Sequence, residues 1–242
     1  LSPGPFSARL EALDLAGLEL FHERSEQDLY KCGALPAGQC TISLIDHGDR
    51  AARFAQFGPC GENTLIFQPE RHEFDIVVPG GRSVAYVRLA QAELMRSLAI
   101  LHEPLAERLT RTRDLQLLGS AGKTGLELAM REIQASGQTL GADSADNRHA
   151  LRCNLIEQVL LSMIAGGDIL PGSAPNLHAR RRVWHLFRSA RLFMEEQLRQ
   201  GRVPNMVDLC AHTRVSERTL RHAFCEQTGH PPMVYLRRMR MN

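Results

Sequence analysis

The chain has 242 residues, of which 43% are hydrophobic and 23% are charged, and its formal net charge is +2. These proportions are typical of a water-soluble globular protein, and the length suits two domains with ordinary cores. No stretch approaches the roughly 20 apolar residues that span a bilayer, and the N-terminus lacks the regions of a signal peptide. We therefore expect a cytoplasmic protein without a membrane partner.

The cysteines and histidines give no sign of a metal centre or a disulfide framework. None of the cysteines forms a C-x-x-C pair, and His47 and His72 are isolated from one another and from other metal-ligand motifs. We expect reduced, mostly buried thiols, no metal and no cofactor. The six cysteines are Cys32, Cys40, Cys60, Cys153, Cys210 and Cys225.

The first 90 residues have the texture of β-structure. Short alternating or apolar runs are separated by Gly, Pro and Asp, which is typical of strands joined by turns. The clearest runs are residues 41–45, 64–67, 74–78 and 83–89. Between the last two, Pro79-Gly80-Gly81 predicts a hairpin turn.

Residues 91–167 favour helices, and a Gly/Pro-rich linker (AGGDILPGSAPN, residues 165–176) follows them. The predicted helices are 92–99, 104–118, 124–136 and 144–164. The last helix has an apolar stripe at near-heptad spacing, which consists of Leu151, Leu155, Val159 and Met163. Such a stripe either packs a helix onto a sheet of the same chain or pairs helices of two chains, and the second interpretation predicts a dimer interface.

Motifs for enzymatic chemistry are weak. GSAGKTG (residues 119–125) resembles a phosphate-binding loop, but that motif needs a glycine where Leu117 stands, and the segment before it reads as helix. A helix that begins at Lys123-Thr124 explains the segment better. With no G-x-S-x-G elbow and no evident Cys/His pair, we predict no catalytic residues and no enzyme activity.

Residues 205–242 predict two short helices joined by a tight turn. Asn205 is a good N-cap, and Asp208 can complete a capping box with it. That helix should end near Thr213. Ser216 is a second N-cap, and Glu217 suits the first turn of the helix that Ser216 opens.

The second helix has two distinct faces. Leu220, Ala223 and Phe224 follow helical spacing and should face inward. Arg218, Arg221 and His222 share that spacing on another face, where they could reach the edges of bases. Gly229 should end the helix, and another helix over residues 233–241 should carry Arg237, Arg238 and Arg240.

Positive charge is concentrated in the same region. Residues 176–242 hold 13 arginines, no lysine and five acidic residues, a net charge of +8, so the preceding part carries −6. A small helical bundle with a solvated basic face is the simpler interpretation. The charge partition favours a polyanionic partner, because arginine grips phosphate or guanine with two parallel hydrogen bonds.

From about Arg181 onward the sequence resembles the DNA-binding domain of AraC/XylS-family transcriptional regulators. The matching residues are the helix 183–198, Val207-Asp208-Leu209, the run from Val215 to Leu220, Phe224, Gly229-His230-Pro231-Pro232 and Tyr235-Leu236-Arg237. The resemblance implies that residues 216–228 form the recognition helix of a first helix-turn-helix unit. Residues 233–241 would begin a linker helix to a second unit, which the sequence up to Asn242 does not include.

The resemblance also implies roles for single residues. Arg218, Arg221 and His222 occupy the positions that face bases, although the family more often has Arg where His222 stands. Arg214 stands where the family has a turn glycine, so it should adopt a left-handed conformation. Cys210 replaces a smaller residue. For phosphate contacts we expect Arg188, Arg202, Ser216 and Thr219.

The predicted fold class is α+β. A cupin-like β-rich sensory domain (1–90) with flanking helices should precede a helical dimerisation layer (91–167) and an all-α helix-turn-helix domain (176–242, incomplete). The predicted function is a bacterial transcriptional regulator that binds double-stranded promoter DNA as a homodimer. We expect an activator, although the sequence itself does not distinguish activation from repression. RNA polymerase and a small-molecule effector are further expected partners. The alternatives are a cupin-like enzyme and an adaptor protein that the DNA-binding domain only tethers.

Overall fold

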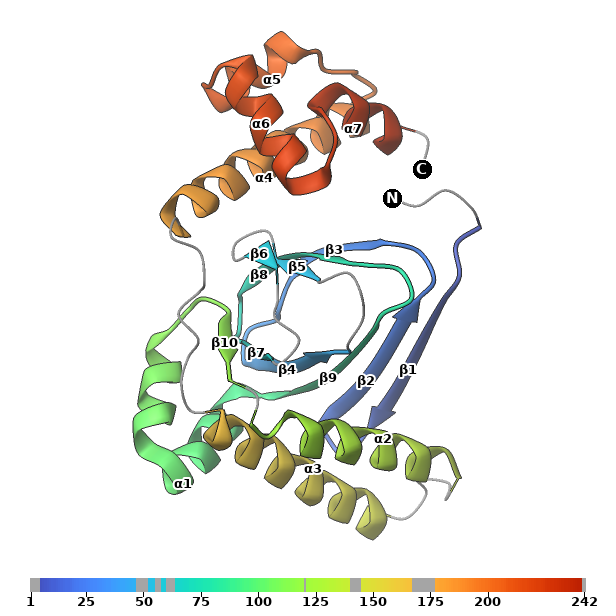
Figure 1. Cartoon of the computed structure of the whole chain (residues 1–242), viewed down its shortest axis with the longest axis vertical. Coiled ribbons are helices and arrows are strands. Elements are labelled where there is room, and N and C mark those ends of the chain that lie inside the picture. The colour runs from blue at the N-terminus through green and yellow to red at the C-terminus, as the bar shows by residue number, and fades with distance from the viewer. Residues whose placement is uncertain are drawn as a thin grey trace. The chain divides into compact units, whose positions relative to one another are not determined.

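A computed structural model describes residues 5–46, 52–54, 58–59, 64–119, 121–139, 145–166 and 177–240 (Figure 1). The chain forms two compact units that meet in sequence between Ser173 and Ala174. The predicted linker, 165–176, spans this boundary, and most of it lies outside the described residues. The first unit combines sheets and helices and the second is helical, so the fold class is α+β.

The first unit contains two sheets. The larger has the strand order β1-β2-β9-β4-β7-β10, and all its neighbouring strands are antiparallel. The smaller has the order β3-β8-β5-β6. The strands are β1 (Ala8–Asp14), β2 (Glu19–Ser25), β3 (Leu29–Ala34), β4 (Gln39–Ile45), β5 (Arg53–Phe54), β6 (Gly58–Pro59), β7 (Leu65–Gln68), β8 (Glu73–Val78), β9 (Ser83–Ala90) and β10 (Gln116–Leu118).

The turn at Pro79-Gly80-Gly81 is present, but the predicted hairpin is wrong. β8 pairs with β3 and β5 in the small sheet, whereas β9 pairs with β2 and β4 in the large one. The turn therefore passes the chain from one sheet to the other. A Cβ on Gly80 would lie 2.4 Å from the carbonyl oxygen of Glu26, so only glycine fits at this close approach.

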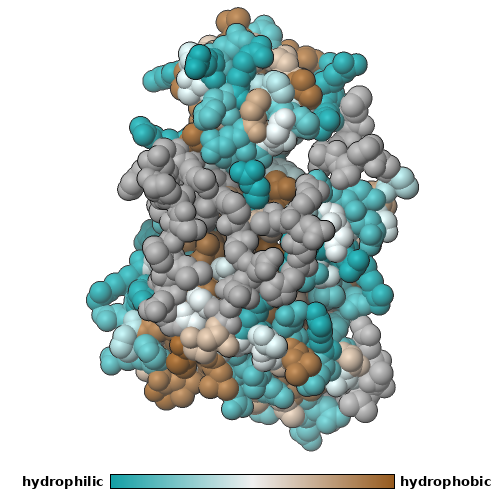
Figure 2. Space-filling model, viewed as in Figure 1, coloured by the Kyte–Doolittle hydropathy of each residue, from teal (hydrophilic) through white to brown (hydrophobic). Residues whose placement is uncertain are grey.

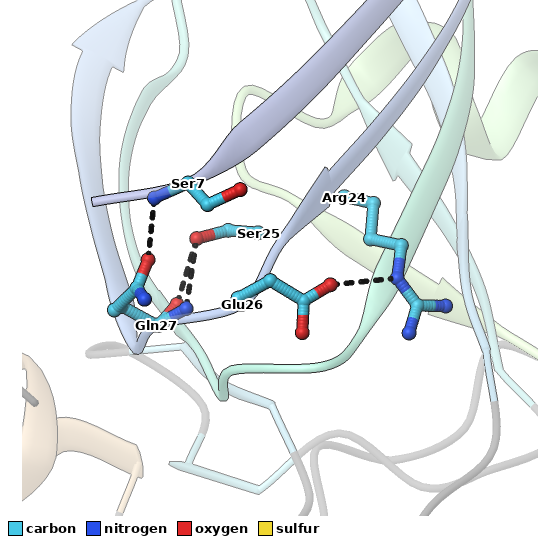
Figure 3. A network of polar contacts seen from close by, with 5 residues as sticks. All are labelled: Ser7, Arg24, Ser25, Glu26 and Gln27. Carbon is cyan, nitrogen blue, oxygen red and sulfur yellow. Dashed lines mark hydrogen bonds and ion pairs between the residues drawn. The ribbon is translucent and has the colours of Figure 1, made fainter. Parts of the chain in front are cut away.

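A second crossover, from β2 to β3, lies against this turn. The N–H of Gly81 donates to the carbonyl of Ser25 (2.7 Å), and the N–H of Gly80 donates to Asp28 Oδ1 (2.9 Å). Around it, Ser25 Oγ donates to the Gln27 carbonyl (2.8 Å), and Gln27 Oε1 accepts from the N–H of Ser7 (2.8 Å) (Figure 3). These bonds satisfy backbone groups that the strands cannot pair, and they fix the corner between the sheets.

Three helices complete the first unit: α1 (Gln91–Arg111), α2 (Lys123–Thr139) and α3 (Ala145–Ala165). α1 is kinked at His102 (φ −156°, ψ 77°), where the sequence predicted a break, and His102 Nδ1 accepts from the N–H of Leu105 (3.2 Å). The predicted extension of this helix to Leu118 is wrong. The helix ends at Arg111, because residues 116–118 pair with β7 as the edge strand of the large sheet.

The helices and the large sheet share one hydrophobic core. Leu155, Val159 and Met163 of α3 are fully buried in it, beside core residues of the strands and of the other two helices, and Leu151 is partly buried against it. These side chains are already covered by their own chain. The stripe therefore lies in the core of its own chain, which agrees with the alternative interpretation, a core-packing helix, and not with the dimer interface predicted for it.

The expectation of mostly buried thiols is also wrong. Cys32, Cys153 and Cys225 are exposed, and Cys210 is partly buried. Cys40 is buried in the core, where desolvation and then the charge of Glu70 raise the pKa of its thiol to about 12. Cys60 and His47 lie outside the described residues.

The second unit contains four helices in its described part: α4 (Leu177–Arg199), α5 (Met206–Thr213), α6 (Glu217–Thr228) and α7 (Pro232–Met239). The bounds of α5, α6 and α7 follow the sequence prediction closely, whereas α4 begins at Leu177, before the predicted Val183. Across the described parts of both units, no helix combines the length and the apolar character that crossing a bilayer requires.

The corrected position of the α3 stripe gives a prediction about stability. Leu155→Ala should lower the free energy of unfolding by about 2–5 kcal/mol, because it leaves a cavity in a close-packed core. The matched control is Leu128→Ala on α2, since Leu128 is 56% exposed and its loss should cost less than about 1 kcal/mol. Urea unfolding followed by circular dichroism measures both. Equal losses would show that Leu155 is not in the core.

Candidate nucleic-acid interface

The N-terminus of α5 is closed by the capping box that the sequence predicts. Asn205 Oδ1 accepts from the N–H groups of Val207 (2.8 Å) and Asp208 (3.1 Å), and Asp208 Oδ2 accepts from the N–H of Asn205 (2.8 Å). Three donors that the helix cannot pair are thereby satisfied. The start of α5 is therefore fixed by residues within three positions of one another.

Arg214, as predicted, occupies the left-handed conformation that ends α5 (φ 54°, ψ 35°). Ser216 then caps α6, with its Oγ accepting from the N–H of Thr219 (3.3 Å). Only three residues separate the two helices, so the turn between them is tight. An arginine in this conformation carries a steric penalty that glycine avoids.

The inward face of α6 is anchored by aromatic packing. Leu220, Ala223 and Phe224 are fully buried, as predicted. The ring of Phe224 packs edge-to-face against Phe187 of α4 (centroids 4.9 Å apart) and Tyr235 of α7 (5.6 Å), and those two rings also meet each other (5.8 Å). This three-ring cluster joins α4, α6 and α7.

A separate contact holds α5 against α4. The imidazole of His212 stacks on the ring of Phe193 (centroids 4.3 Å apart, interplanar angle 14°), and its Nε2 lies 3.3 Å from Ser189 Oγ. Leu209 is fully buried beneath the same helix. Both α5 and α6 are therefore fixed to α4 (Figure 1).

The outward face of α6 carries the three predicted base-contacting residues. Arg218, Arg221 and His222 are all exposed, and their spacing places them on one stripe along the helix. Cys225, which the sequence analysis did not single out, is exposed and continues the stripe one turn further. Seven residues, about two helical turns, separate Cys225 from Arg218, so the sequence alone indicates that they share a face.

Two acidic residues on α6, Glu217 and Glu226, lie beside these cations. Their pairing with the exposed cations was not predicted from the sequence. Glu217 Oε1 accepts from Arg221 Nε (2.7 Å) and lies 2.6 Å from its Nη2. Glu226 Oε2 lies 3.4 Å from His222 Nε2, an ion pair when the imidazole is protonated. Arg218 pairs with no acidic side chain among the described residues. The i, i+4 spacing of both pairs is visible in the sequence.

The Glu217–Arg221 pair is open to solvent, with 52% and 54% of the two side chains exposed. Pairs of this kind contribute about 0–1 kcal/mol, whereas a bidentate arginine–guanine contact discriminates by about 1–3 kcal/mol. The pair therefore orients Arg221 without preventing it from contacting a base.

The four predicted phosphate-contacting residues lie in different settings. Ser216 and Thr219 are exposed at the N-terminus of α6, where their hydroxyl oxygens lie 2.9 Å apart. Arg202 is exposed in the connection between α4 and α5, at the edge of a hollow of about 610 Å³. Arg188 is partly buried, and its guanidinium lies over the ring of Trp184 (5.5 Å to the centroid).

The turn between α6 and α7 is tied to α7. Arg238 Nη1 contacts His230 Nε2, and because a guanidinium has only donors, that ring nitrogen accepts. Partial desolvation and then the charge of Arg238 lower the pKa of His230. Both effects favour the neutral form of the imidazole. Gly229, as predicted, ends α6 in the left-handed conformation (φ 73°).

The alternative candidate sites in the first unit are the GSAGKTG segment and a metal centre. Lys123, the lysine of the GSAGKTG segment, is buried at the start of α2, and its Nζ donates to the carbonyl of Ile45 (3.0 Å). It therefore caps a strand end and does not face a phosphate-binding loop. Among the described residues, no three His, Cys, Asp or Glu side chains gather as metal ligands.

No family model matches the chain. Its structure is similar to that of the AraC-like transcriptional activator CuxR, with a TM-score of 0.48 and 14% identity over 98% of this chain and 80% of that one. ToxT from Vibrio cholerae O395, bound to (E)-4-(8-methylnaphthalen-1-yl)but-3-enoic acid, gives a TM-score of 0.34 and 10% identity over 96% of this chain and 98% of that one.

The left-handed turn residue gives a prediction about the second unit. Arg214→Gly should be more stable than Arg214→Ala by about 0.5–1 kcal/mol, because both remove the charge but only glycine removes the steric penalty. The fluorescence of Trp184, the chain's one tryptophan, which is buried in α4, follows unfolding of this unit in urea. An alanine variant as stable as the glycine variant would contradict the assigned conformation.

Proposed function

We propose that the chain is a sequence-specific DNA-binding transcriptional regulator of the AraC/XylS type, and that α6 is its recognition helix in the major groove. The observation that carries this proposal is the two-sided character of α6. Its inner face is fixed by Leu220, Ala223 and Phe224, and its outer face presents Arg218, Arg221 and His222. A helix held in this way fits the width of the major groove.

The side chains on that face match the chemistry of base edges. Arginine donates two parallel hydrogen bonds to O6 and N7 of guanine, and a carboxylate accepts from N4 of cytosine. The adjacent Arg221 and Glu217 therefore suit a G·C-containing site. Arg218, which has no carboxylate partner among the described residues, is the cation most available to a guanine.

Phosphate contacts would fix the position of α6 on the duplex without reading the sequence. Ser216 and Thr219 suit this role, because the N-terminus of a helix attracts a phosphate through its partial positive charge and its N–H groups. Arg202 is exposed and joins the same proposal. Arg188 joins it through its guanidinium, which the ring of Trp184 orients.

The first unit has the expected sensory role in this proposal. Its two antiparallel sheets would form a cupin-like domain that responds to a small-molecule effector, and RNA polymerase would be the protein partner at the promoter. The proposal places this activity in the cytoplasm of a bacterium.

A homodimer also belongs to the proposal, but the buried stripe of α3 cannot form it. Exposed apolar residues at the junction of α1 and α3 are better placed: Ile100 is 85% exposed, Leu101 57% and Leu161 50%. Figure 2 shows hydrophobic surface at the lower left, where α1 lies in Figure 1. A second copy of the chain would remove these side chains from water.

DNA reading is tested on sites that the unmutated chain selects from random oligonucleotides. Arg221→Ala should weaken binding to the selected site by about 1–3 kcal/mol and relax preference at one or two base pairs, with a smaller effect on random DNA. Arg199→Ala is the matched control, because Arg199 is also an exposed arginine in an ion pair on its own helix, α4. It should weaken both DNAs alike or not at all.

In the same assay, Glu217→Gln tests how the negative charge of this side chain affects overall DNA affinity and how it affects recognition of the base sequence. The amide keeps the size of the side chain but removes a negative charge from the interface, so binding to random DNA should strengthen while discrimination falls. Binding to all DNAs should decrease steeply with salt, because arginine–phosphate contacts release counterions. Failure of the chain to select any sequence, or equal losses on both DNAs for Arg221→Ala, would overturn the assignment of α6.

The dimer is tested by sedimentation at micromolar concentration. The unmutated chain should be a dimer, and the Ile100→Lys variant should be monomeric. The introduced ammonium group would be desolvated and unpaired in an apolar contact. Val207→Lys is the control, because Val207 is 75% exposed but lies on α5. A folded monomer for the unmutated chain would overturn the homodimer, and a dimer that survives Ile100→Lys would place the interface elsewhere.

A further inference from the structure

The first unit contains a pocket of about 420 Å³ between α2 and the face of the large sheet that packs against the helices. Its floor is apolar and includes Leu20, Leu44 and Met130, which are buried side chains of β2, β4 and α2. This volume falls within the range of small-molecule sites, which are typically apolar with a few convergent polar groups.

Two buried acceptors that line the pocket have no hydrogen-bond donor among the described residues. They are Oε1 of Gln134, on α2, and Oδ1 of Asp46, directly after β4. Nη1 of Arg82 forms an ion pair with Asp46 Oδ1 at 3.7 Å, a separation that exceeds hydrogen-bond distance. Buried acceptors without a donor are costly and uncommon in native proteins.

The charges at the rim are already compensated. Arg131 pairs with Glu127 (2.6 Å), and Arg24, also at the rim, pairs with Glu26 (3.3 Å). Glu11 pairs with Arg9. An anionic ligand would therefore lose hydration without gaining an unpaired cation, and Arg82, whose Nη1 lies 3.7 Å from Asp46 Oδ1, already balances the charge of that carboxylate against a cationic ligand.

We propose that this pocket binds a neutral small molecule with an apolar ring or chain and at least two hydroxyl donors, which bond to Gln134 and Asp46. This pocket would be the effector site of the regulator proposed above. The inference rests on that proposed function only for the effect of the ligand on DNA binding. Binding itself involves the first unit alone.

The test is a titration of the whole chain, labelled with ¹³C at the methionine methyl groups, with three compounds of one skeleton. Resorcinol offers two donors, 1,3-dimethoxybenzene offers none, and 3,5-dihydroxybenzoate adds a negative charge. Resorcinol should shift the methyl signal of Met130 in a saturable way, and the other two should bind at least about tenfold more weakly. The signal of Met194, buried in the second unit, should not move.

Gln134→Leu is the diagnostic variant. It should weaken resorcinol binding at least about tenfold and leave the ligand-free melting temperature unchanged or raised, because an unsatisfied acceptor is replaced by an apolar group of similar size. Gln158→Leu on α3, outside the pocket, should leave binding unchanged. If Gln134→Leu does not fold, the selectivity among the three compounds decides alone.

No saturable shift of Met130 with resorcinol would show that the pocket holds only water, and equal binding of all three compounds would show an apolar cavity without donor selectivity. Either result overturns the proposal. Since these measurements contain no DNA, they succeed or fail independently of the recognition helix.

Discussion

The packing of Phe187, Phe224 and Tyr235 is the constraint on which the proposed interface depends. These rings come from three helices, and each touches the other two edge-to-face. Because Phe224 is fully buried, α6 cannot turn about its own axis. A rotation by one residue, about 100°, would push a guanidinium into the core at a cost of several kcal/mol. The exposed stripe of cations is therefore a consequence of the aromatic packing.

Features that depend on neighbouring residues were predictable from the sequence. The capping box of Asn205 and Asp208, the cap at Ser216 and the left-handed Gly229 each involve side chains and backbone groups within four positions. Steric and hydrogen-bonding rules act directly at that range. The bounds of α5 and α6, which are short helices capped by neighbouring side chains, were accordingly close to the structure.

Features that depend on distant partners were not predictable. The residues after Pro79-Gly80-Gly81 form a strand in either case, but the turn alone does not say that β9 pairs with residues 19–24 and 39–45. The stripe of Leu155, Val159 and Met163 has the same spacing whether it covers a sheet or a second helix. Only the three-dimensional arrangement distinguishes these outcomes, because burial is a property of the whole unit.

The acidic residues of α6 connect the charge pattern to the function. The second unit carries a net charge of +8, which favours any polyanion. Glu217 and Glu226 nevertheless lie beside Arg221 and His222 on the helix that would enter the groove. Near a phosphate each carboxylate is repelled, whereas near the amino group of cytosine it gains a hydrogen bond. In the proposed complex the acidic pair would therefore lower non-specific affinity more than specific affinity, so the surrounding arginines would supply attraction while the face of α6 would supply discrimination.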